Sequence, residues 1–153
     1  MTNAGVVAAT ARSIIDNNLY MVLGTADPSG RPWVSPVYYA PAAYRDFFWV
    51  SKPQAMHSRN LMARPEVSIV IFDSSVPIST GQGVYMSAYA QEVTGDEREE
   101  GIQLFSLRSL GHGGHEWTLK DVESPARVRL YRATAVDLYV LDEHDERVPV
   151  TDV

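Results

Sequence analysis

The spacing of apolar residues changes along the chain from a helical period to a strand period. Near the N-terminus the apolar residues recur at intervals of three and four: Val7, Ala8, Ala11, Ile14 and Ile15. Such spacing is typical of one buried helix face. In residues 83–94, by contrast, apolar residues alternate with Tyr85, Ser87 and Tyr89. That period of two predicts a strand with one face toward a core.

The same reasoning divides the whole chain into short elements. Helices are expected over residues 4–18, 53–63 and 96–110, and strands over residues 20–25, 31–40, 47–51, 67–73, 83–94 and 126–141. Strands outnumber helices and do not alternate with them, which argues against a doubly wound parallel sheet. The pattern favours a mainly β (α+β) fold, a six- to seven-stranded antiparallel barrel with short flanking helices. We expect residues 1–153 to form a single domain, ending in an acidic tail from Asp142.

Composition and charge exclude several classes of protein. With 153 residues, 45% of them hydrophobic and 21% charged, the chain resembles an ordinary globular protein. The net charge of −6 disfavours nucleic-acid binding, and the absence of cysteine excludes disulfides and thiol catalysis. We find neither a basic segment before a long apolar core nor the roughly 20 apolar residues of a membrane span. These features predict a soluble, cytoplasmic protein.

The segment after the third predicted strand carries the most suggestive chemistry. Ser51 and Gln54 have the spacing of a helix capping box, and Pro53 suits the first helical turn. His57, Ser58, Arg59 and Asn60 follow on the first turns of that helix. A hydroxyl, an imidazole and a guanidinium at the start of a helix can hold an anion such as phosphate. The alternative is a solvated helix face with no ligand.

Three segments resemble one known family. Residues 31–39 (RPWVSPVYY), 46–51 (DFFWVS) and 57–70 (HSRNLMARPEVSIV) are similar to the pyridoxamine 5'-phosphate oxidase-like family. The resemblance covers about residues 5 to 140. It implies a split β-barrel and a homodimer that binds FMN, or in some branches the deazaflavin F420, in two clefts at the dimer interface.

Site residues follow from this resemblance one position at a time. It implies that Ser51 contacts the cofactor phosphate, and it puts His57 where the family often has a lysine and Met56 where pyridoxamine phosphate oxidases have an arginine. The implied cofactor-binding set is Trp33, Val34, Ser35, Pro36, Val37, Trp49, Val50, Ser51, His57, Ser58, Arg59, Asn60, Gln82 and Trp117. Because the C-terminal tail is acidic and lacks the basic residues of those oxidases, pyridoxamine phosphate is not the expected substrate.

Other clusters leave alternatives open. His112 and His115 lie in a glycine-rich loop, where they are either two metal ligands or polar residues of a cleft entrance. We expect no metal, since a third ligand is missing. Arg127 and Arg129 either face the cleft or pair with the acidic helix at residues 97–100. Four tyrosines are expected on the barrel surface or in a dimer interface: Tyr38, Tyr39, Tyr85 and Tyr89.

The sequence contains no catalytic triad and no close carboxylate pair, so we expect a bound cofactor to supply the chemistry. The first hypothesis is an FMN-dependent oxidoreductase that transfers a hydride between the flavin and a small organic substrate. The alternatives are an F420-dependent reductase of the same fold and a non-catalytic flavin- or haem-binding protein. The fourth hypothesis is a split-barrel protein whose cofactor site has decayed.

Overall fold

A strongly curved antiparallel sheet forms the body of the protein in a computed structural model that describes residues 3–153. The strand order is β2-β1-β5-β6-β7-β4-β3, and β8 pairs with β7. The strands are β1 (Tyr20–Ala26), β2 (Pro32–Tyr38), β3 (Ala40–Ala42), β4 (Asp46–Ser51), β5 (Glu66–Phe72), β6 (Gly83–Glu92), β7 (Arg129–Leu141) and β8 (Arg147–Pro149). The predicted mainly β (α+β) split barrel with short helices is confirmed.

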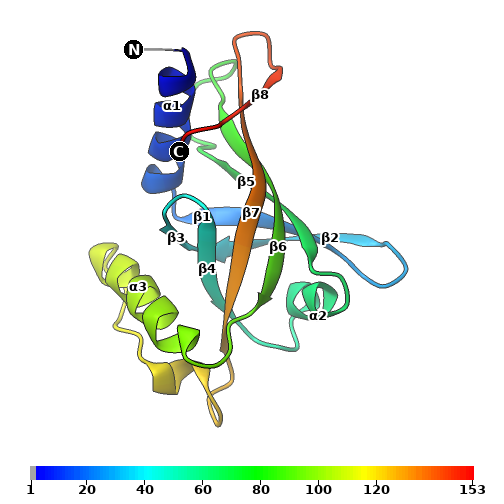
Figure 1. The fold of residues 1–153 in the computed structure, drawn as a ribbon, viewed down its shortest axis with the longest axis vertical. Helices are drawn as coiled ribbons and strands as arrows, with labels where there is room; N and C mark the ends of the chain where they lie inside the picture. Colours follow the sequence, from blue (N-terminus) through cyan, green and yellow to red (C-terminus); the bar gives the residue numbers. More distant parts are fainter. Residues whose placement is uncertain (1–2) are drawn as a thin grey trace.

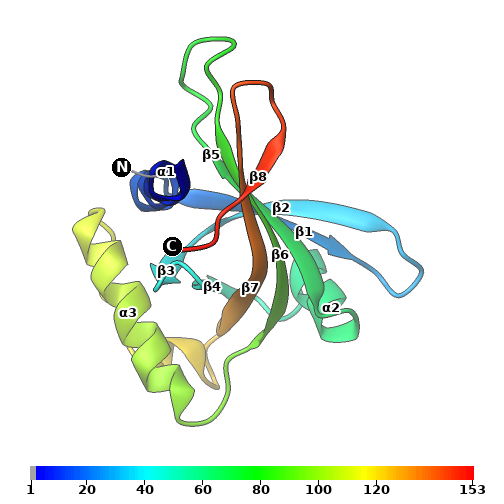
Figure 2. The same cartoon turned by 45° about the horizontal axis from the view of Figure 1, so that its top comes forward.

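Within residues 3–153, three α-helices and one short 3₁₀-helix surround this sheet. They are α1 (Asn3–Asn17), α2 (Met56–Ala63), α3 (Glu97–Gly111) and the 3₁₀-helix η1 (Leu119–Val122). Figure 2 shows α1 near the end of the sheet where the β7–β8 hairpin protrudes, and α2 beside the β1–β2 hairpin. The third helix, α3, packs against β3 and β4. No helix within residues 3–153 is long and apolar enough to cross a membrane.

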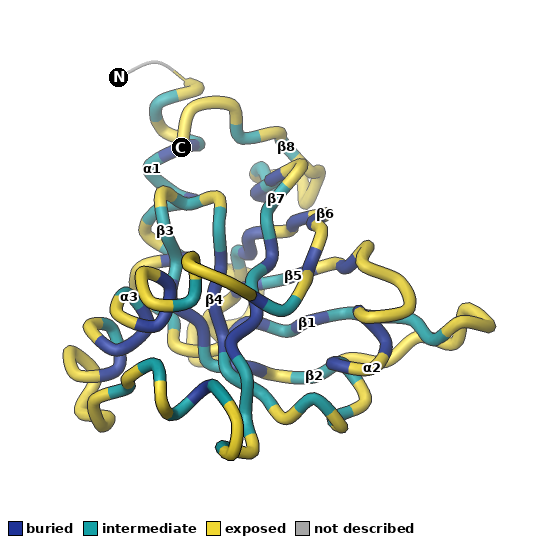
Figure 3. The backbone as a smooth tube through the Cα atoms, turned by 60° about the horizontal axis from the view of Figure 1, so that its bottom comes forward, coloured by how far each residue is buried: buried dark blue, intermediate teal, exposed yellow. Residues whose placement is uncertain are grey.

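The interior of the barrel is filled by the alternating apolar residues that the sequence predicted. Buried and exposed residues alternate along β6, and the dark segments in Figure 3 follow the central strands. Within this core Trp49 stacks on Tyr131, with ring centroids 5.7 Å apart and planes inclined by 15°. Both side chains are almost fully buried. Burial of such large rings contributes much of the core's apolar area.

A second, smaller core lies between β4 and α3. Phe48 and Leu130 project away from the barrel interior and meet Phe105 of α3. Gly101 permits this close packing, since a Cβ there would lie 2.9 Å from Leu130 Cδ2 and 3.0 Å from Phe48 Cε1. The packing of α3 against the strand therefore depends on a residue without a side chain.

One side of the sheet carries apolar residues that nothing covers within residues 3–153. We call it the outer face, the solvent side of β2, β1, β5, β6 and β7. Its exposed apolar residues include Val34, Tyr85, Tyr89 and Val136, with Val34 66% exposed and Val136 58% exposed. A contiguous apolar surface of this kind usually marks a binding site or an interface.

Several predicted boundaries were wrong, each for a local reason. The second helix begins at Met56 rather than Pro53, because residues 52–55 form a turn in which the Ala55 N–H donates to the Lys52 carbonyl. No side chain caps that helix. The strand expected at 31–40 breaks at Tyr39, which is fully buried instead of lying on the surface, and its hydroxyl donates to the Ile15 carbonyl at 2.6 Å. The acidic tail forms β8 instead of simply ending the fold.

Candidate functional site

A hydroxyl–imidazole pair lies where β4 passes into α2. The Ser51 Oγ and His57 Nε2 atoms are 2.8 Å apart, and the hydrogen bond is partly buried. The Ser51 side chain therefore contacts His57 and does not form the predicted capping box. Burial lowers the pKa of His57 below its ordinary value of 6.5, so the ring is neutral at pH 7. One proton is used between Ser51 and the neutral ring, so the intact pair can donate one hydrogen bond to an oxyanion, and His57 brings no positive charge at neutral pH.

The rest of α2 closes the end of the barrel. Ser58 and Asn60 are buried, and Asn60 Nδ2 donates to Thr25 Oγ1 at 3.1 Å. At the C-terminal end of the helix the Arg64 guanidinium donates to the Pro28 carbonyl. Arg59 is exposed and forms no side-chain hydrogen bond or ion pair within residues 3–153. Of the four helix residues predicted to hold an anion, His57 and Arg59 thus remain accessible, while Ser58 and Asn60 serve the core.

A groove of about 630 Å³ runs over the outer face, lined by residues of β1, β2, β5, β6 and β7. Its floor is a cross-strand row of small residues, since Gly24 lies opposite Ser68 and Ser68 lies opposite Ser87. Trp33 and Val34 form one wall. Trp33 is the cross-strand partner of Thr25, the residue to which Asn60 of α2 donates. The groove is open, mostly apolar, and in the size range of small-molecule sites.

The other predicted residues of β2 and β4 divide between surface and core. Pro36 is exposed and Ser35 is half-buried, whereas Val37 points into the barrel. Trp49 is enclosed in the barrel interior, and Val50 packs with the second core beneath α3. Neither β4 side chain is available to a ligand on the outer face.

Gln82 lies at the opposite end of the barrel from Ser51. Its side chain donates to the Leu141 carbonyl at 2.7 Å and accepts from the Leu141 N–H at 2.8 Å. Ser51 is the cross-strand partner of Arg129, at the other end of β7. Twelve residue steps along that strand correspond to roughly 40 Å. Within one chain, therefore, Gln82 is not brought together with the Ser51–His57 pair.

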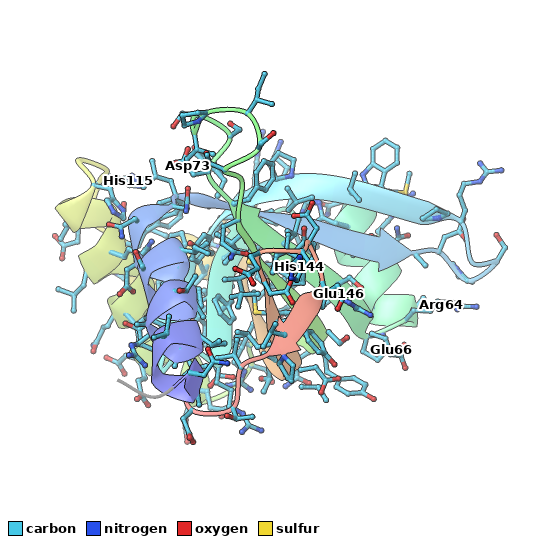
Figure 4. All side chains as sticks on the ribbon, turned by 90° about the horizontal axis from the view of Figure 1, so that it is seen from above. Arg64, Glu66, Asp73, His115, His144 and Glu146 are labelled. Carbon is cyan, nitrogen blue, oxygen red and sulfur yellow. The ribbon has the colours of Figure 1, made fainter. Side chains whose placement is uncertain are left out.

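Trp117 and the two loop histidines belong to the layer of α3. Trp117 contacts Phe105 edge to face at 5.6 Å and His115 at 4.4 Å between ring centroids. The Tyr38 hydroxyl and His112 Nδ1 are 2.7 Å apart. Figure 4 shows His115 on the opposite side of the molecule from Arg64 and Glu66, which flank the end of α2. Within residues 3–153 no group of three or more metal-ligating side chains is present.

The floor and one wall of the groove were not predicted from the sequence. Gly24, Ser68 and Ser87 are individually unremarkable strand residues, and only the register between three strands brings them into one row. Val136 becomes exposed because the β6–β7 register shifts near Ser87 and Ala88. A bulge of this kind leaves no reliable mark in a single sequence.

Comparisons with known proteins agree with this architecture. The family described as pyridoxamine 5'-phosphate oxidase matches residues 7–141. A heme binding protein from Mycobacterium smegmatis has a similar structure, with a TM-score of 0.76 and 19% identity over 99% of this chain and 59% of its own. This chain thus spans about three fifths of that protein's length. No curated protein matches in sequence.

Two further solved structures share the fold. HutZ, a heme storage protein from Vibrio cholerae, has a TM-score of 0.66 and 20% identity over 84% of this chain and 89% of its own. An F420 reductase has a TM-score of 0.61 and 16% identity over 83% of this chain and 94% of its own. At these identities the likeness concerns the fold alone. The family match over most of the chain is the decisive finding, and the protein belongs to the pyridoxamine 5'-phosphate oxidase family.

Proposed function

We propose that this protein is a homodimeric, FMN-dependent oxidoreductase that transfers a hydride between the flavin and a small organic substrate. The observation that carries the proposal is the Ser51–His57 pair, a polar anion seat at the start of α2, in a chain that also has an open apolar groove on its outer face. A flavin mononucleotide has the matching division into a flat ring system and a phosphate. Membership of the family supports the same cofactor.

The residues present fit such a cofactor. The Ser51 hydroxyl would donate a hydrogen bond to the phosphate while accepting one from His57 Nε2, and the exposed guanidinium of Arg59 would supply positive charge. Trp33 and Val34 would cover part of the ring system and exclude water from it. When bound, FMN supplies the redox chemistry, and this chain supplies binding, orientation and shielding.

A second copy of the chain would cover the outer face. Exposed Val34, Tyr85, Tyr89 and Val136 give this face the aromatic and aliphatic character of a subunit interface. The groove is open on one side in the single chain, so a partner would supply the missing wall. We therefore expect a dimer in solution by light scattering, and a clearly monomeric protein would contradict this part of the proposal.

The alternatives keep the same fold and change the ligand. Two of the similar structures are named as heme-binding or heme storage proteins and one as an F420 reductase. The discriminating experiment is a visible absorption titration of the purified protein with FMN, F420 and haem in turn. Saturable perturbation of the FMN spectrum, followed by reduction and reoxidation of the bound flavin, is the expected result. Tight binding of haem or F420 with no binding of FMN would refute the proposal.

A further inference from the structure

A basic cleft lies next to the Ser51–His57 pair, between the turn at residues 52–55 and the segment that leads into β7. Its volume is about 410 Å³, and its lining includes Lys52, Gln54, Arg127 and Arg129. Three of these four side chains are cations. In a protein with a net charge of −6, such a concentration of positive charge requires an explanation.

None of these cations is neutralised by a carboxylate within residues 3–153. The arginines that do form ion pairs with glutamates are Arg98, with Glu123, and Arg132, with Glu97. Of the two alternatives for Arg127 and Arg129, pairing with the acidic helix is therefore contradicted, because it is Arg132 that forms the ion pair with Glu97. Glu92 shares an adjoining hollow with Arg129 but forms no ion pair with it. The cleft keeps its full positive charge.

The guanidinium of Arg129 is held in place. Its Nη1 donates to the Ala126 carbonyl at 2.6 Å and to the Val128 carbonyl at 2.7 Å, and the side chain is half-buried. Its other nitrogens form no hydrogen bond within residues 3–153 and remain available to a ligand. Fixing an arginine in advance reduces the entropy lost when an anion binds.

The position of Arg129 links the cleft to the candidate cofactor site. Arg129 and Ser51 are directly opposite in the β4–β7 ladder. Side chains of directly opposite residues leave the sheet on the same face, roughly 5 Å apart at their Cβ atoms. Lys52 follows Ser51 in the chain, so two of the three cations adjoin the hydroxyl–imidazole pair.

We propose that this cleft binds a small molecule, or part of one, that carries at least two carboxylate or phosphate groups. Two separated anionic groups match the spread of Lys52, Arg127 and Arg129 better than one would, and arginine suits both carboxylate and phosphate. The anion has two sources, an acidic extension of the cofactor or a separate acidic substrate. The existence of the site does not depend on the cofactor being FMN.

The test uses citrate and inorganic pyrophosphate as probes in calorimetric titrations of the full chain at low salt. We expect saturable binding that the double variant Lys52→Gln/Arg127→Gln weakens at least ~10-fold, since charged hydrogen bonds are individually worth about that factor. The matched control is Arg31→Gln/Arg45→Gln, which removes the same charge from two exposed arginines outside the cleft. Binding to the control should stay within about twofold of wild type if long-range charge contributes little.

The outcomes separate this proposal from the proposed function. Absence of probe binding, or equal binding to wild type and the cleft variant, overturns it. Binding of citrate to the FMN-loaded protein identifies a separate acidic molecule as the ligand. Exclusion of citrate by a bound cofactor identifies the cofactor's own anionic extension. If citrate binds and FMN does not, the cleft stands while the FMN proposal falls.

Discussion

Replacing Ser51 by alanine is the most direct test of the anion seat. In the free protein the change removes the 2.8 Å hydrogen bond to His57, whose ring is only half-buried. An ordinary intramolecular hydrogen bond contributes about 1 kcal/mol. The expected loss in the free energy of unfolding is therefore small, and the variant should fold normally.

In the complex the same change removes a hydroxyl donor to a charged phosphate oxygen. Hydrogen bonds to charged groups contribute about 1.5–3 kcal/mol, or roughly 10- to 100-fold in affinity. Riboflavin has the same ring system without the phosphate. We therefore expect Ser51→Ala to weaken FMN binding by that factor and to leave riboflavin binding unchanged.

Quenching of flavin fluorescence measures both affinities under one set of conditions. Ser51→Thr keeps a hydroxyl and should bind FMN nearly as wild type does. Ser74→Ala is the control, since Ser74 is exposed on the β5–β6 loop, away from α2. An equal fall for FMN and riboflavin would mean that the variant distorts the groove. No fall for either would remove Ser51 from the site.

Three further predictions concern charge, packing and assembly. Because burial lowers the pKa of His57, the unfolded chain binds more protons than the folded protein below pH 6.5. The free energy of unfolding should therefore fall as the pH drops below 6.5. Urea denaturation between pH 5 and 8 measures this fall, and the part due to His57 should vanish in His57→Gln. Gly101→Ala should be destabilising by about 1 kcal/mol in thermal unfolding, because overpacking against Phe48 costs about 1–3 kcal/mol and exceeds the gain of about 1 kcal/mol in helix propensity; a stabilised variant would show that α3 moves away easily. Val34→Glu adds a charge to the outer face and should give a folded monomer in light scattering, whereas an unchanged dimer would place the interface elsewhere.

The sequence predicted the fold well because the barrel follows from local periodicity. Alternation along residues 83–94 identified the buried face of β6 correctly, and the helical spacing near the N-terminus identified α1. These patterns depend on neighbours two to four residues apart, so one sequence contains them. The family resemblance was confirmed for the same reason, since its motifs lie within single strands and one helix.

The candidate site was harder to predict because it depends on which strands are neighbours. The predicted start of α2 was wrong because the Ser51 hydroxyl forms a hydrogen bond with His57 and does not cap the helix backbone. Trp49 lies on the inner face of β4, and its aromatic character alone did not reveal that. The row Gly24, Ser68 and Ser87 exists only through the pairing of β1, β5 and β6.

The charge of the seat has to come from outside the hydroxyl–imidazole pair. A neutral His57 leaves Arg59, Lys52 and the arginines of the basic cleft as the cations available to a bound phosphate. Their side chains are wholly or partly accessible to solvent, and salt screens charges at such sites strongly over distances of about 10 Å at 0.1 M ionic strength. Near neutral pH, therefore, the affinity for an anionic cofactor should depend more on ionic strength than on pH. The affinity for a cofactor without a phosphate should depend on neither ionic strength nor pH. Comparing FMN with riboflavin across a salt series therefore separates the contribution of the cations from that of the apolar groove.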